Sequence, residues 1–105
     1  MKERFKNIPL VKNETKKRFE MEVDGYFAFI NYGEIGNQIT LVHTEAAPEL
    51  SGTGAASAVV EKTLHWLGQN NKTLLPFCPY VFAYIKKNPQ WKRIVDKRFN
   101  AYDKL

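Results

Sequence analysis

The chain has one cysteine and two histidines among its 105 residues. A single cysteine excludes an internal disulfide framework, and these few side chains cannot supply the four ligands of a cysteine and histidine zinc site. We therefore expect no metal. The sequence also lacks a run of about 18 apolar residues, the length that a membrane-spanning helix needs, and no apolar stretch follows its basic start as in a secretory signal. We expect a cytoplasmic protein without a membrane segment.

Long linkers, low-complexity runs and internal repeats are absent as well, so we expect a single compact domain over residues 1–105. Hydrophobic residues make up 44% of the chain and aromatic residues 13%, which favours a well-packed core. A domain of this size buries roughly 65% of the surface that its unfolded chain exposes. That burial is enough for one core and not for two.

The charge is unevenly distributed around a net value of +5. Residues 1–18 and 86–105 each carry seven Lys or Arg against two acids, whereas residues 19–85 carry two against seven. The acidic middle, and the lack of aromatic residues spaced regularly among the basic ones, disfavour a nucleic-acid partner. The basic ends are either solvated surface, or the C-terminal cations receive a phosphorylated ligand. Those cations are Lys86, Lys87, Lys92 and Arg93.

Alternation of polar and apolar residues predicts strands in the first half of the chain. Residues 18–23 and 26–32 flank Asp24-Gly25, and together they predict a hairpin with a tight turn. Residues 38–44 predict a third strand. An earlier strand around residues 8–11 is only weakly indicated, because Pro9 interrupts it.

In the second half the apolar spacing changes to three and four residues, which predicts an amphipathic helix over residues 56–67. Residues 73–78 then predict a short buried strand, and Pro79 suits the first position of a second helix. Asn88-Pro89 ends that helix, and residues 90–98 predict another. This order predicts an α+β fold, in which an antiparallel meander is joined to a strand–helix–strand crossover.

Two glycines precede the first long helix, in the segment Ser51-Gly52-Thr53-Gly54-Ala55-Ala56. Glycines there let the backbone approach a ligand, and free N–H groups at a helix start form an anion site. No Gly-Lys-Ser/Thr follows, so the segment is not a Walker A loop, and Ser57 stands where a dinucleotide fingerprint has its third glycine. On these grounds the segment is either a turn or a phosphate-binding loop.

Cys78 ends the predicted strand at residues 73–78 and directly precedes Pro79, so we expect it to cap the next helix. The partial positive charge of a helix N-terminus favours thiolate over thiol; the alternative is a small buried apolar side chain. His43 lies near the end of the 38–44 strand, at the same sheet end as Cys78 if the two strands are parallel neighbours. His43 is either a general base or a hydrogen-bonded strand residue. We expect His65 to face solvent without a role.

These features, in this order, resemble the GNAT superfamily of N-acetyltransferases. The segment from Pro48 to Ala55, followed by a helix, resembles the superfamily's acyl-CoA pyrophosphate loop. Leu41-Val42-His43-Thr44-Glu45 and Pro76-Phe77-Cys78-Pro79-Tyr80-Val81 resemble its minimal members of roughly a hundred residues, which lack the N-terminal helices of larger members. The resemblance covers about residues 17–96. Glu49 departs from it, because Gln or Arg usually stands there.

The resemblance implies a GNAT-like acyl-CoA N-acyltransferase fold. It also implies an enzyme that binds acetyl-CoA as co-substrate, without a metal, and transfers the acetyl group to an amine. In this comparison Cys78 and His43 flank the acyl thioester, and backbone N–H groups of the loop hold the pyrophosphate. Those N–H groups belong to Gly52, Thr53, Gly54 and Ala55.

Several alternatives stay open. The transfer is either direct, with His43 as base, or covalent, with Cys78 taking the acetyl group first. Tyr80 and Tyr84 are either packing residues or acids toward the departing CoA. The alternative to an enzyme is a non-catalytic CoA-binding module. The acceptor amine is not identified by the sequence, and a monomer is the default expectation.

Overall fold

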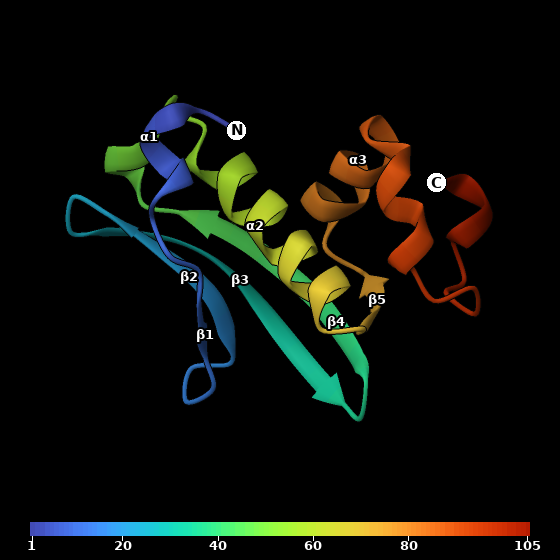
Figure 1. Cartoon of the computed structure of the whole chain (residues 1–105). Helices are drawn as coiled ribbons and strands as arrows, with labels where there is room; N and C mark the ends of the chain where they lie inside the picture. The colour runs from blue at the N-terminus through green and yellow to red at the C-terminus, as the bar shows by residue number, and fades with distance from the viewer.

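The computed structural model describes residues 1–105, the whole chain, and consists of a five-stranded mixed sheet with helices (Figure 1). The strands follow the sheet order β1-β2-β3-β4-β5. Their bounds are β1 Val11–Asn13, β2 Arg18–Val23, β3 Tyr26–Ile35, β4 Gln38–Ala46 and β5 Thr73–Pro76. The α-helices are α1 Glu3–Lys6, α2 Ala55–Gln69 and α3 Pro79–Lys87; the 3-10 helices are η1 Pro48–Leu50, η2 Pro89–Ile94 and η3 Tyr102–Lys104.

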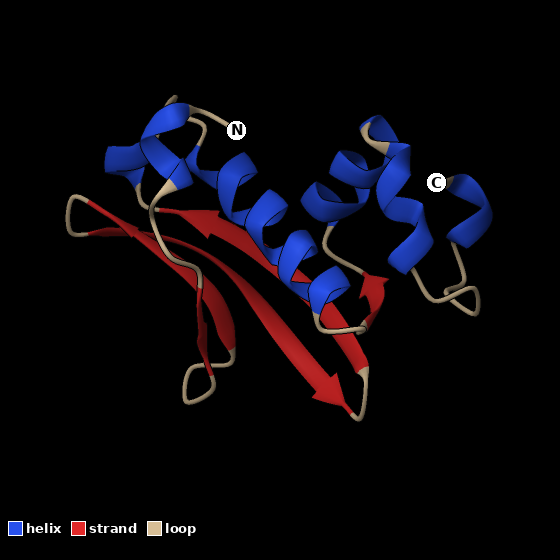
Figure 2. Cartoon of the chain, viewed as in Figure 1, coloured by secondary structure: helices blue, strands red, loops and turns tan.

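The predicted α+β architecture is confirmed. Strands β1 to β4 form an antiparallel meander, and β5 returns through α2 to pair with β4 in parallel. The long helix α2 lies across one face of the sheet (Figure 2). On that face the ring of Phe19 in β2 lies 5.2 Å from the ring of Trp66 in α2. We call this side of the sheet the covered face.

The opposite side of β2, β3 and β4 carries mainly polar and aromatic side chains, and we call it the open face. Its residues are Arg18, Glu20, Glu22, Phe27, Phe29, Asn31, His43 and Glu45. The Arg18 guanidinium lies 4.3 Å from the centroid of the Phe29 ring and 5.4 Å from that of Phe27. This cation–π stacking shields the two rings from water without a covering helix.

A β-bulge in β4 changes which residues face which side. Asn31 of β3 pairs with His43, but Tyr32 pairs with Leu41, so Val42 is left without a partner. An extra residue in a strand shifts its alternation by one. Beyond the bulge, Thr44 therefore lies opposite the buried Ile30 on the covered face, and His43 lies on the open face.

Two predicted elements are wrong. The early strand expected around residues 8–11 is instead β1 at Val11–Asn13, which begins after Pro9, a residue without the N–H that a ladder needs. Residues 90–98 do not form an α-helix. η2 ends at Ile94, and Val95 turns extended to make a parallel bridge with Leu74, because the outer edge of β5 offers free backbone groups.

No helix of the structure combines the length and the apolar character needed to cross a membrane.

Candidate functional site

The glycine segment forms a turn that only glycine adopts easily. Gly52 and Gly54 have φ values of 75° and 89°, in the left-handed region that side chains with a Cβ avoid. Gly54 is also the N-cap of α2 and, as a glycine, has no side chain that could cap the helix. The first turn of α2 contains no acidic residue, so the helix dipole meets no fixed negative charge there.

Several backbone N–H groups of this turn make no hydrogen bond within the protein. The N–H of Thr53 donates to the Leu50 carbonyl at 3.1 Å, and that of Ala55 donates to the Thr53 hydroxyl at 3.2 Å. The predicted phosphate ligands Thr53 and Ala55 thus already use their N–H groups in the turn. The N–H groups without a protein acceptor are those of Gly52, Gly54, Ala56 and Ser57. Sequence reasoning missed Ala56 and Ser57, although the first four N–H groups of any helix lack an intrahelical partner.

A lysine from the start of the chain lies against this turn. A Cβ atom placed on Gly54 would come within 3.5 Å of the Lys2 Cε atom and 3.8 Å of its Nζ atom. A cavity of about 230 Å³ lies beside it, between the first residues of the chain and the first turns of α2. Lys2 forms no ion pair, so its charge is available beside the free N–H groups.

The other basic residues of the N-terminal segment are largely engaged in ion pairs. They neutralise acids from the middle of the chain, which explains the charge pattern of the sequence. The pairs are Arg4 with Asp24, Lys12 with Glu34 and Arg18 with Glu20. Lys2 differs from them because its neighbour is a glycine turn.

A second cavity, of about 340 Å³, lies between α2 and α3 and is lined by Ser57, Tyr80, Tyr84 and Lys87. Ser57 lines both cavities, so both border the first turn of α2. Lys87 is the residue of the predicted C-terminal cation group that faces this space.

Glu61 joins α2 to the start of the chain and to α3. Its carboxylate lies 3.8 Å from the Met1 amino group and accepts a hydrogen bond from the Tyr84 hydroxyl at 3.0 Å. Burial, together with this bond to Glu61, raises the pKa of Tyr84 to about 12. Such a phenol is a poor proton donor at neutral pH, which favours packing over acid catalysis for Tyr84.

Cys78 is the N-cap of α3, as predicted, and is 2% exposed. Its N–H donates to the Leu41 carbonyl at 2.8 Å, which fixes the start of α3 against β4. Its Sγ atom lies 3.2 Å from the Oγ1 atom of Thr44. The thiol is therefore held at a helix N-terminus beside a hydroxyl on the covered face.

His43 and Cys78 lie near the same ends of parallel neighbouring strands, as predicted, but the structure does not bring their side chains together. Thr44, the neighbour of His43, contacts Cys78, and adjacent strand residues point to opposite faces. His43 lies on the open face, where its Nε2 atom is 3.2 Å from the Oε1 atom of Glu45. Both side chains are well exposed, at 58% and 60%. The role of His43 as base stays a prediction.

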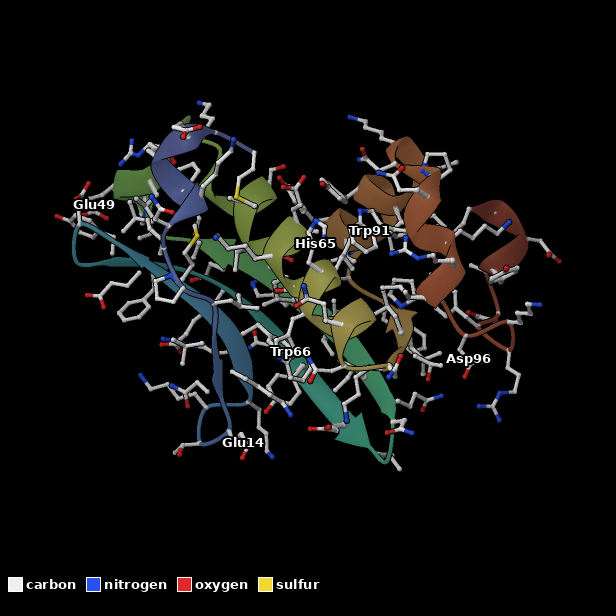
Figure 3. All side chains as sticks on the ribbon, in the orientation of Figure 1. Glu14, Glu49, His65, Trp66, Trp91 and Asp96 are labelled. Atoms are coloured by element: carbon white, nitrogen blue, oxygen red, sulfur yellow. The ribbon has the colours of Figure 1, made fainter.

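Other features lie apart from this arrangement. The largest cavity, about 690 Å³, lies between Ile8–Leu10 and α2 and contains none of the predicted site residues. His65 is exposed, as predicted, and its ring stands perpendicular to the Trp91 ring, with the two ring centroids 4.8 Å apart. Figure 3 labels both side chains. Glu49 is exposed and forms no ion pair. The structure has no group of three or more metal-ligating side chains.

The fold and site define a class: a mixed sheet whose parallel strand pair is joined through a helix that begins in a glycine turn with free N–H groups. The family model described as GCN5-related N-acetyl-transferase matches residues 18–94. This match spans the hairpin, the glycine turn, Cys78 and the whole of η2. The chain belongs to the GCN5-related N-acetyltransferase family.

Proposed function

We propose that this chain binds acetyl-CoA and transfers its acetyl group to an amine, with Cys78 as the first acceptor of that group. The observation that carries the proposal is the set of N–H groups without acceptors at the start of α2. Such groups favour a phosphate ligand, and the family supplies acyl-CoA as its source. Membership of the family fits an acyl transfer and leaves the acceptor open.

In this proposal the pyrophosphate lies at the turn from Gly52 to Ser57, with the Lys2 ammonium beside it. The cavity beside this turn shares Ser57 as a lining residue with the cavity that is lined by Tyr80, in the first turn of α3. Cys78 heads the same turn. The remainder of the CoA molecule can therefore extend from the anion site toward the thiol. The protein acts as a monomer in the cytoplasm.

The covalent route begins at the Cys78 thiol, which gives its proton to solvent. Its sulfur then bonds to the acetyl carbonyl carbon, the bond from that carbon to the CoA sulfur breaks, and CoA leaves as a thiolate that solvent protonates. A neutral amine next attacks the carbonyl carbon of the new thioester, the bond from that carbon to the Cys78 sulfur breaks, and the proton that the nitrogen loses passes to solvent, which leaves the amide and the Cys78 thiolate. Cys78 lies at the N-terminus of α3, where the partial positive charge of the helix faces the sulfur as it attacks.

Direct transfer is the second candidate, and the His43–Glu45 pair favours it. A carboxylate beside an imidazole orients the ring, as a general base requires. In this route an amine approaching across the open face loses its proton to His43 and attacks the acetyl carbonyl carbon. The bond from that carbon to the CoA sulfur breaks in the same reaction, and CoA leaves as a thiolate that solvent protonates. Cys78 is then a structural residue.

Calorimetric titration with CoA and acetyl-CoA, followed by intact-mass measurement of the acetyl-CoA-treated protein, tests the proposal. We expect saturable binding of one ligand per chain and the added mass of one acetyl group, mapped by proteolysis to Cys78. Binding without this adduct, but with amine turnover, favours direct transfer. Binding without any turnover identifies a CoA-binding module. The absence of binding contradicts the proposed function as a whole.

A further inference from the structure

The side chain that contacts the Cys78 thiol is that of Thr44, and a β-bulge in β4 places it there. Regular alternation from Ile39 and Leu41 would put residue 43 on the covered face and residue 44 on the open face. The bulge at Val42 reverses this order, so that Thr44 is paired with Ile30 on the covered face. The side chain brought to the thiol by the bulge is a hydroxyl and not an imidazole.

The Thr44 hydroxyl forms no other hydrogen bond within the protein. Its Oγ1 atom lies 3.2 Å from the Cys78 Sγ atom, and its side chain is half-buried beside the apolar core. A hydroxyl in such surroundings is costly unless it is hydrogen-bonded, and a valine of the same shape would fill the space without that cost. The contact with sulfur is therefore the polar interaction that residue 44 makes.

The chemistry of this pair differs between the two forms of the cysteine. A thiol donates weakly, so its S–H can point to the threonine oxygen; a thiolate only accepts, so the threonine O–H turns toward the sulfur. Hydrogen bonds to a charged acceptor are about twice as strong as those between neutral groups. The hydroxyl consequently stabilises the thiolate more than the thiol.

We propose that Thr44 is a positioning residue for the Cys78 nucleophile and shifts it toward the thiolate. This inference rests on the proposed covalent function. The Thr44 proton stays on its oxygen throughout: the hydroxyl donates a hydrogen bond to the thiolate, turns the sulfur toward the acyl carbon and releases it when the sulfur–carbon bond forms. Proton exchange for Cys78 and CoA takes place with solvent.

The variants Thr44→Val and Thr44→Ser test this role. Valine keeps the shape and removes the hydroxyl, whereas serine keeps the hydroxyl. Thr40→Val is the matched control, because it removes a hydroxyl from the same strand on the opposite face, where Thr40 pairs with Gly33 and Leu75. The first readout is the ultraviolet absorbance that a thiolate adds at mildly alkaline pH, measured against Cys78→Ala to subtract the tyrosines. The second is the rate at which acetyl-CoA acetylates the protein.

We expect Thr44→Val to lower both the thiolate fraction and the acetylation rate about tenfold, while CoA affinity is unchanged. Thr44→Ser recovers most of the loss, and Thr40→Val matches the wild type. Wild-type absorbance and rate in Thr44→Val overturn the inference. So does a serine variant as impaired as the valine variant, because shape alone then accounts for the effect. If the wild type forms no adduct, the covalent function fails, and the absorbance series still decides the role of Thr44 separately.

Discussion

The two faces of the sheet divide the chemistry-bearing residues of this protein between them. The covered face, beneath α2, holds Thr44 and borders Cys78 at 2% exposure. The open face holds His43 and Glu45, both well exposed to solvent. A thiol on one side and an imidazole on the other side of the same strand end cannot exchange a proton directly.

This division separates the tasks of the proposed reaction. The covered side carries the helix N-termini of α2 and α3, which favour negative charge: the pyrophosphate at one and the thiolate at the other. The open side carries Glu22 and Glu45, which favour a cationic amine, and no helix blocks the approach to His43 there. In such an arrangement the acyl donor binds on the covered side of β4, and an amine held at His43 reaches it only around the end of the strand.

The strongest test of this division between the two faces is to remove one reactive side chain from each face. We expect Cys78→Ala to keep CoA binding and to abolish the acetylated protein completely, because no other thiol is present. His43→Ala should keep the adduct and slow its transfer to an added amine. Intact mass with and without amine measures both steps. An acetyl adduct that persists in Cys78→Ala at wild-type yield, or none in His43→Ala, would show that the two faces do not divide the reaction in this way.

The general fold could be predicted from local patterns. Alternation at residues 18–23 and 26–32, the Asp24-Gly25 turn and the helical spacing after Gly54 each depend on neighbouring residues, and all three are confirmed. The placement of Cys78 as a helix cap also follows from one dipeptide, Cys-Pro.

The parts that sequence reasoning missed depend on contacts between distant segments. The bulge at Val42 is a mismatch between β3 and β4, and nothing in the β4 residues alone marks it, so the face of His43 could not be predicted. The position of Lys2 against Gly54 joins segments separated by half the chain. The helix predicted over residues 90–98 does not form, because Val95 pairs instead with Leu74 at the free edge of β5.

The glycine turn offers a second test, which asks whether CoA binds at this turn, on the covered side of the sheet. Gly52 and Gly25 both have positive φ, and a Cβ on either would meet no atom within 4 Å. Gly52→Ala and Gly25→Ala should therefore each lower the free energy of unfolding by about 1 kcal/mol through backbone strain. Only Gly52→Ala should weaken CoA binding, by roughly tenfold, because the free backbone N–H groups of the glycine turn then lose their alignment toward the phosphate. Equal CoA affinities in the two variants, measured by calorimetry, would place the site elsewhere.

Lys2→Ala should have a smaller effect on the same site. An exposed ion pair contributes about 0.2–1 kcal/mol, so CoA affinity should fall by up to about fivefold. The difference in CoA affinity between Lys2→Ala and the wild type should vanish at about 1 M salt, where the screening length is about 3 Å. If Lys2 contacts the pyrophosphate, the same difference should be measured with CoA that lacks its 3′-phosphate. The control is Lys6→Ala, since Lys6 is paired with Glu3. If Lys2→Ala binds CoA at low salt with the affinity of the wild type, Lys2 is a surface residue that takes no part in CoA binding.

The smallest effect concerns the edge where the C-terminal segment reaches the sheet, at Asp96. Hydrogen bonds from the Arg98 side chain and backbone, and a weaker one from Gln38, hold the pKa of Asp96 well below its usual range. A lowered pKa in the folded state means that the carboxylate stabilises the fold above its unfolded pKa of about 3.9, and that this contribution is lost as the pH falls through the folded value.

Asp96→Asn should therefore be slightly less stable than the wild type at neutral pH and should lose less stability on acidification. Thermal unfolding followed across the acid range measures both effects. Asp103→Asn, which removes a carboxylate without an ion pair, should follow the wild-type curve. If Asp96→Asn has the same acid dependence as the wild type, the Asp96 carboxylate does not help to attach the C-terminal segment to the sheet. That attachment then rests on the Leu74–Val95 bridge and on apolar packing.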